Sequence, residues 1–182
     1  MHVRPATPSD TPTILEVHRA AFDSPVEPQL VADLLAAPEA HPLVSTVAEA
    51  EGVVVAHVLL TNGLAPGHPD LRVQLLAPLA VHPDHQGRGV GTLVTSRALD
   101  TARDAGVDCV CVLGHPSFYP RFGFVPLLPG GPLPLVDLPS DHAAAWMTLV
   151  LGTDRQRIAS ALDGVRLSWA GPLQDPALWG PD

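Results

Sequence analysis

The sequence contains no lysine, and its ten basic residues are all arginine. They are outnumbered by 19 acidic residues, so the formal net charge of the 182-residue chain is -9 at pH 7. Proteins that bind nucleic acids depend on basic side chains that neutralise phosphates, so this shortage argues against that class. A strongly negative protein instead attracts positively charged partners, and a cationic amine fits this charge.

Long apolar runs are also missing. No uninterrupted run approaches the roughly 20 residues with which a helix spans a membrane. The segment 1–13 is polar and proline-rich, without the apolar centre of a secretory signal. We therefore expect a protein without a membrane anchor and with a cytoplasmic location.

Cysteine is scarce. Cys109 and Cys111 are two positions apart in an expected strand, so their side chains share one face without reaching the geometry of a disulfide. Free cysteine is among the most often buried residue types. We expect two buried thiols.

Hydrophobic residues make up 46% of the chain, which suffices for one domain with a sizeable core. Their spacing alternates between strand and helix periods, which predicts an α/β fold. We expect strands at 1–5, 43–49, 53–61, 72–81, 107–113 and 143–151, and helices at 11–22, between Pro25 and Pro38, and at 90–105. Loops are expected at 62–70 and 127–142, and in the weakly patterned tail a helix at 158–162 and an extended segment at 165–169.

Pro78 interrupts the expected central strand 72–81. Proline has no amide hydrogen, so a bond of the sheet must be missing there, which predicts a bulge or a splay from the neighbouring strand. The strand, the helix 90–105 and the strand 107–113 form a crossover unit, so the two strands should be parallel. A gap between them would let a ligand reach backbone groups.

The turn between strand 72–81 and helix 90–105 is rich in glycine. Gly87, Gly89 and Gly91 remove Cβ atoms where the helix begins, so an anion such as a pyrophosphate could approach the free amides there. The lysine-bearing phosphate loop is absent, and so is the dinucleotide fingerprint G-x-G-x-x-G. A close packing point without a ligand is the alternative interpretation of these glycines.

Two segments carry a resemblance to a known family. The segment 86–91, Gln-Gly-Arg-Gly-Val-Gly, resembles motif A of the GNAT superfamily of N-acyltransferases, Q/R-x-x-G-x-G/A. The segment 119–124 is similar to its Y-x-x-x-G-F motif, and 112–126 resembles a bacterial branch of small acyltransferases. The resemblance covers residues 1–151, and we expect 152–182 to be a C-terminal extension packed on the same domain.

The resemblance implies a GNAT fold, with a mixed, splayed central sheet flanked by helices. It also implies an acetyltransferase that transfers an acetyl group from acetyl-CoA directly to a primary amine of a small molecule or peptide. We expect a monomer or a homodimer, and the sequence leaves the choice open. The amides of 87–92 would bind the pyrophosphate, and the edge 79–81 would pair with the pantetheine arm. The implied cofactor contacts are Leu79, Ala80, Val81, Gln86, Gly87, Arg88, Gly89, Val90, Gly91, Thr92 and Ser117.

Tyr119 is the only tyrosine, and in the family position it would return a proton to the CoA thiolate. The alternative is an aromatic packing residue. Val112 departs from the family pattern, because many members have an asparagine there that contacts the cofactor. Ser117 could replace that contact, or it could cap the turn before Phe118.

A general base for the amine is not evident. Glu27 and His57 are candidates, although Glu27 also suits a helix start and His57 a satisfied structural histidine. His82 and His85 lack a third ligand nearby, so we expect no metal site. An acyl-CoA-binding sensor without turnover is the alternative function, and the identity of the acceptor stays open.

Overall fold

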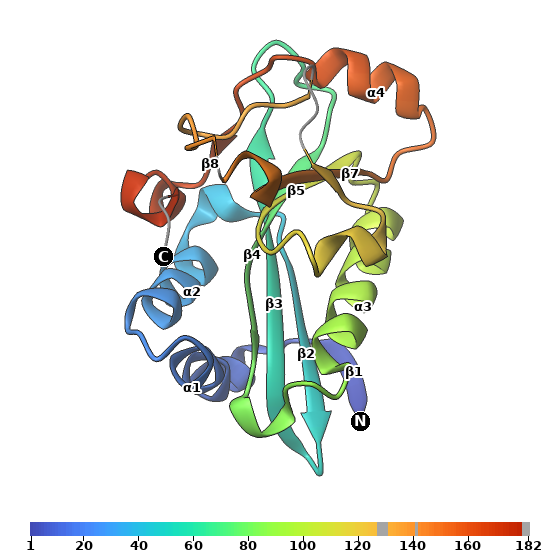
Figure 1. Cartoon of the computed structure of the whole chain (residues 1–182). Helices are drawn as coiled ribbons and strands as arrows, with labels where there is room; N and C mark the ends of the chain where they lie inside the picture. The colour runs from blue at the N-terminus through green and yellow to red at the C-terminus, as the bar shows by residue number, and fades with distance from the viewer. Residues whose placement is uncertain (127–130, 141, 180–182) are drawn as a thin grey trace.

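The computed structural model describes residues 1–126, 131–140 and 142–179. One sheet runs through it in the order β1-β2-β3-β4-β5-β7-β6, and β8 pairs with β3 (Figure 1). Only β4 and β5 are parallel among the named strand pairs. The strands are β1 His2–Pro5, β2 Val44–Ala50, β3 Val53–Leu64, β4 Val73–Val81, β5 Cys109–Leu113, β6 Val125–Pro126, β7 Trp146–Val150 and β8 Ser168–Trp169. The expected mixed α/β architecture is confirmed.

Helices cover both faces of the sheet. They are α1 Thr11–Phe22, α2 Val26–Ala36, α3 Val90–Asp104 and α4 Arg155–Leu162. Figure 1 shows α1 and α2 on one side of the long strands and α3 on the other. Val94 and Ala98 of α3 are buried in one apolar cluster with β2 to β4, while Ile14 and Val17 of α1 belong to a cluster on the opposite face. The apolar residues that recur at helical spacing in α1 and α3 are therefore the ones that face the sheet and are buried, as the spacing predicts.

The parallel strands β4 and β5 separate partway along their length. Val73–Leu75 pair with Cys109–Cys111, but beyond Leu75 the register of β4 continues only with β3. On β3, Val58 pairs with Leu79 and Leu60 with Leu76, so Ala77 and Pro78 form a bulge opposite Leu59. The sequence predicts a bulge or a splay at Pro78, and the structure has both: the bulge contains Pro78, and the separation from β5 begins after Leu75.

Strand β3 is longer than expected. Residues 62–64 belong to it, so the loop expected at 62–70 begins only after Leu64. Gly63 pairs with Trp169 of β8, and a Cβ on Gly63 would lie 2.3 Å from the Trp169 ring. Glycine here makes room for an aromatic ring from the distant tail rather than forming a turn, which is why the local prediction was wrong.

Other boundaries differ by a few residues. β2 ends at Ala50, β4 begins at Val73 and β5 at Cys109, while Ala143–Ala145 form a 3-10 turn ahead of β7. The short strand β6 was not expected. Within the expected loop 127–142, residues 127–130 and 141 lie outside the described residues, and Leu133 forms an isolated bridge with Arg166.

Several residues of the tail lie in an apolar cluster with the sheet. Trp169, Leu173 and Trp179 are buried there with Leu34 of α2 and Trp146 of β7. The indole nitrogen of Trp179 donates to the Leu173 carbonyl oxygen at 2.9 Å, which satisfies its buried polar group. The part of the tail that contains Leu173 therefore lies beside α2.

The two cysteines are buried, unpaired thiols, as expected. Burial raises the pKa of the Cys111 thiol well above its ordinary value, which keeps it protonated and unreactive. No described helix has the length and apolar character needed to cross a membrane.

Candidate active site

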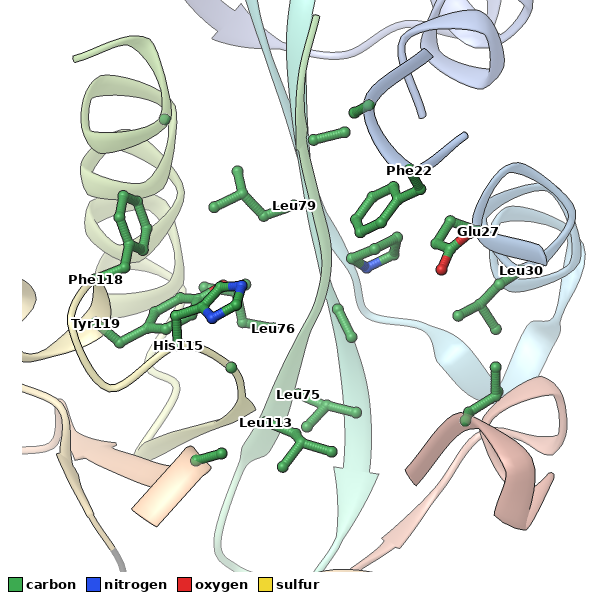
Figure 2. Close-up of a pocket in the computed structure, with 18 of the residues that line it drawn as sticks. Phe22, Glu27, Leu30, Leu75, Leu76, Leu79, Leu113, His115, Phe118 and Tyr119 are labelled. Atoms are coloured by element: carbon green, nitrogen blue, oxygen red, sulfur yellow. The ribbon is translucent and has the colours of Figure 1, made fainter. Parts of the chain in front are cut away.

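A cavity of about 900 Å³ occupies the place where β4 and β5 diverge (Figure 2). Its lining comes from both strands, from the ends of α1 and α2, from the segment after β5 and from the tail. The lining residues are Ala21, Phe22, Glu27, Leu30, Leu75, Leu76, Ala77, Pro78, Leu79, Ala80, Val81, Gln86, Gly91, Leu113, Gly114, His115, Pro116, Ser117, Phe118, Tyr119, His142, Ala145, Leu173, Leu178 and Trp179. The open edge of β4 thus faces a space large enough for a ligand.

The glycine-rich turn leads from β4 into α3. The Gln86 side-chain amide donates to the Val81 carbonyl oxygen at 3.0 Å, which ties the turn to the end of the strand. Gly87 and Gly89 have φ values of +69° and +77°, a backbone conformation that favours glycine. A Cβ at either would meet nothing within 4 Å, so this surface of the turn is open.

Helix α3 begins immediately after Gly89. The Leu93 N–H donates to the Gly89 carbonyl oxygen, so the three preceding amides, of residues 90–92, have no acceptor within the helix. These amides carry the positive end of the helix dipole. The turn can therefore hold an anionic group without any lysine.

The sequence-predicted cofactor residues fall into two groups. Six of them line the cavity: Leu79, Ala80, Val81, Gln86, Gly91 and Ser117. The remaining five, Gly87, Arg88, Gly89, Val90 and Thr92, lie in the turn and first helical residues outside that lining. The Val90 side chain is buried in the core, so only its backbone amide is available to a ligand. The 3-10 turn Tyr119–Phe122 has no side-chain cap, so the alternative role for Ser117 is not observed.

Tyr119 lines the cavity on the side of α3 (Figure 2). Its ring packs edge-on against Phe118, with 5.0 Å between ring centroids, and against Phe124 at 5.6 Å. Burial raises the pKa of the phenol above its ordinary value, because the charged form loses its solvation. The Tyr119 ring therefore packs against neighbouring aromatic rings. Tyr119 also lines the cavity, and its phenol is protonated.

The opposite half of the cavity lies beside α1 and α2. We call this half the α1–α2 side. It is formed by Phe22, Glu27 and Leu30, and by Leu178 and Trp179, which share an apolar cluster with Leu30. Figure 2 shows the Glu27 carboxylate between the side chains of Phe22 and Leu30, across β4 from Tyr119. Of the two candidate bases, Glu27 is the one that the fold brings into the cavity.

His57 is buried outside the cavity lining. Its Nδ1 lies 2.9 Å from His18 Nε2, and its Nε2 lies 2.9 Å from Ser45 Oγ. Burial holds the pKa of His57 well below its ordinary value, so this imidazole is neutral at pH 7. The structural interpretation of His57 is therefore the one observed, and the hypothesis that it acts as base in the cavity is wrong.

Several lining residues were not singled out from the sequence. Gly114, His115 and Phe118 follow β5, within the segment 112–126 whose resemblance to the family was noted without a role for these residues. Leu178 and Trp179 belong to the tail, whose weak pattern gave no signal at all. Among the described residues, no group of histidine, cysteine, aspartate or glutamate could hold a metal ion, and His82 accepts a hydrogen bond from the Asp84 amide instead.

Comparison with known proteins places this site in a family. The family model described as "Acetyltransferase (GNAT) domain" matches residues 2–127. The uncharacterized N-acetyltransferase YjhQ of Escherichia coli K12 is 41% identical over 142 residues, which cover 76% of this chain and 78% of YjhQ. The uncharacterized N-acetyltransferase YhbS of the same strain is 34% identical over 125 residues, covering 68% of this chain and 73% of YhbS.

Two solved structures share the fold over most of both chains. Escherichia coli YhbS in complex with CoA has a TM-score of 0.78 and 27% identity, covering 94% of this chain and 91% of that one. A GNAT family acetyltransferase from Brucella melitensis in complex with acetyl-CoA has a TM-score of 0.72 and 26% identity, covering 94% and 97%. The motifs, the splayed sheet and these relatives agree, and the chain belongs to the GNAT family of acetyltransferases.

Proposed function

We propose that this protein transfers an acetyl group from acetyl-CoA to a primary amine by direct attack of the amine on the thioester. The observation that carries the proposal is the divergence of β4 from β5 at a cavity that also contains Tyr119. The free amides at the start of α3 lie at the end of the same strand, so one extended ligand could reach both.

The proposed position of the cofactor follows from backbone groups that have no partner in the sheet or helix, at the start of α3 and along the edge of β4. The pyrophosphate would accept hydrogen bonds from the amides of residues 87–92, where the glycines leave the approach clear. The pantetheine arm would pair with Leu79–Val81 like an added strand, because this edge of β4 has lost its neighbour. Relatives with the same fold bind CoA and acetyl-CoA, which supports this assignment.

The reaction requires a neutral amine, since an ammonium has no lone pair. The amine nitrogen would form a bond to the thioester carbonyl carbon, and an amide of β4 would stabilise the charge that develops on the carbonyl oxygen. As the C–S bond breaks, the Tyr119 phenol would give its proton to the CoA sulfur. The amine nitrogen would lose its extra proton to solvent water, and the Tyr119 phenolate would take a proton back from water, so that the products are the amide and the CoA thiol. Burial raises the pKa of the Tyr119 phenol, so the phenol carries a proton at neutral pH, and the same shift makes it a weaker acid than an exposed tyrosine.

A covalent acyl-enzyme is not part of this proposal. Cys109 and Cys111 are buried on β5 and are absent from the described cavity lining. Burial also keeps the Cys111 thiol protonated, whereas a nucleophile must be a thiolate. Direct attack therefore agrees better with the placement of the thiols.

The test is thiol release from acetyl-CoA across a panel of primary amines, with calorimetry of CoA binding in parallel. We expect CoA to bind and at least one amine class to be acetylated, with one thiol released per acetylated product. Tight CoA binding without turnover on any amine would instead favour an acyl-CoA sensor. Absence of CoA binding would reject both functions.

A further inference from the structure

Glu27 occupies an unusual position for a carboxylate. It lies in the first turn of α2, and its side chain lines the α1–α2 side of the cavity between Phe22 and Leu30 (Figure 2). Among the described residues of the cavity lining, it is the only aspartate, glutamate, lysine or arginine. The described part of the lining therefore has one acidic side chain, on the half opposite Tyr119.

One oxygen of this carboxylate is unsatisfied. Oε2 of Glu27 is shielded from solvent and accepts no hydrogen bond from any described group. A buried carboxylate oxygen without a donor is costly, and native structures usually supply a partner. A ligand that brings an N–H donor to this point would remove that cost.

Roles internal to the fold do not account for this geometry. An acidic residue in the first turn of a helix can favour the dipole, but it can do so from solvent. Glu27 gives α2 no cap, because the N-cap position is Pro25 and the first helical amide, Val26 N–H, donates to Ser24 Oγ at 3.1 Å instead. No ion pair of Glu27 is found among the described residues.

The surroundings of Glu27 are apolar. Phe22 is 41% exposed although it is large and aromatic, and its ring stacks on buried His18 with 6.1 Å between centroids. Leu30 of α2 and Leu178 of the tail line the same half of the cavity. Apolar and aromatic side chains in a cavity wall are typical of a ligand-binding site.

We propose that Glu27 is the anionic contact for the acceptor, and that the acceptor is a primary amine attached to an apolar alkyl or aryl body. This inference rests on the proposed function and names the substrate class of the same site. On binding, the ammonium would donate to Oε2 of Glu27, while its apolar body would lie against Phe22, Leu30 and Leu178. It would then lose one proton to solvent water, so that the neutral amine attacks the thioester. The net charge of -9 favours the approach of such a cation.

The experiment compares Glu27→Gln with the matched control Glu16→Gln. Glu16 is exposed on α1 and is not part of the described cavity lining, so its substitution removes the same charge without touching the site. The probes are phenethylamine, which is cationic and apolar, and glucosamine, which is cationic and polar. KM for each amine and KM for acetyl-CoA are measured, together with calorimetric binding of phenethylamine to the CoA-bound protein.

In the wild-type protein, phenethylamine should have the lower KM of the two amines. In Glu27→Gln, the KM and Kd for phenethylamine should rise about tenfold or more, the scale of a lost hydrogen bond to a charged group. The KM for acetyl-CoA should stay within about twofold, and Glu16→Gln should leave all these constants unchanged. An unchanged KM for acetyl-CoA also shows that the variant is folded.

Two results would overturn the inference while leaving the proposed function intact. The first is an active Glu27→Gln variant whose KM for phenethylamine equals that of the wild type. The second is a wild-type protein whose KM for glucosamine is lower than its KM for phenethylamine. If the wild-type protein acetylates no amine, the proposed function fails, but phenethylamine binding still tests Glu27. Binding that Glu27→Gln does not weaken would then reject the contact itself.

Discussion

Gly114 lies directly against the ring of Tyr119. A Cβ added at Gly114 would be 2.3 Å from Cε2 of Tyr119, far inside contact distance. The Gly114 amide also donates to the Ala145 carbonyl oxygen at 2.9 Å, so the backbone there cannot easily retreat. The position of the phenol in the cavity therefore depends on the absence of a side chain at residue 114.

Gly114→Ala should displace the Tyr119 ring and lower kcat. We expect a cost of about 1–3 kcal/mol in the free energy of unfolding, the usual range for overpacking. If the loss of kcat acts through the phenol, adding Gly114→Ala to Tyr119→Phe should lower kcat little further. Steady-state kinetics of the two single variants and the double variant measure this. If the losses of kcat were fully additive in free energy, Gly114→Ala would not act through the Tyr119 phenol.

Tyr119→Phe removes the phenolic oxygen but keeps the ring that packs on Phe118 and Phe124. We expect kcat to fall about 10²-fold, the scale of a lost general acid, with the KM for acetyl-CoA nearly unchanged. Because burial raises the pKa of Tyr119, the wild-type kcat profile should show no loss from its ionisation below pH 10. Near wild-type turnover in the variant would identify Tyr119 as a packing residue only.

Gly89→Asn tests the phosphate turn with little backbone strain. Asparagine tolerates the left-handed conformation that Gly89 adopts, whereas valine would not, so Asn adds a side chain while keeping the turn. The Kd for CoA should rise about tenfold, the scale of one lost charge-assisted hydrogen bond. Gly52→Asn is the control, because Gly52 has φ +80° and an equally open Cβ position in the β2–β3 turn. Equal CoA affinities in Gly89→Asn and Gly52→Asn would show that the pyrophosphate does not bind at the turn that contains Gly89.

The buried pair of His18 and His57 should make stability depend on pH. Burial lowers the pKa of His18 to about 4 and that of His57 well below its ordinary value, so both imidazoles are neutral in the folded protein. Since the unfolded chain binds protons at these sites below about pH 6.5, folding stability is complete above that pH and falls as the pH drops. His18 alone should cost about 1 kcal/mol between pH 7.5 and 5.5.

Urea denaturation at these two pH values measures this effect. The double variant His18→Leu, His57→Leu replaces both partners with apolar groups and should lose most of the pH dependence. If the double variant kept the same difference between pH 7.5 and 5.5, other groups would be responsible. Asp10 is not one of them in this window, because its bonds to Arg4 lower its pKa and confine its contribution to more acidic conditions.

The parts of the fold that depend on local chemistry could be predicted from the sequence. Pro78 lacks an N–H, and this residue alone predicted a bulge or a splay in β4, where the structure has a bulge. The glycines of residues 87–91 and the helical period after them located the start of α3. The core faces of α1 and α3 followed in the same way from the spacing of apolar residues.

The parts that depend on distant contacts could not be predicted. Glycine is typical of loops, so Gly63 was assigned to one. It belongs to a strand because it pairs with Trp169, which is far along the chain. His18 carried no signal, because its partner His57 is 39 positions away. The missing donor at Glu27 depends on how α2 meets the rest of the cavity, which no local pattern encodes.

The most direct test of the account is an experimental structure of the protein with CoA. We predict that the pyrophosphate accepts hydrogen bonds from the amides of residues 87–92 and that the pantetheine arm pairs with Leu79–Val81 along the open edge of β4. The sulfur should then lie near the Tyr119 hydroxyl. CoA bound away from the opening between β4 and β5, or with its sulfur out of reach of Tyr119, would contradict the account.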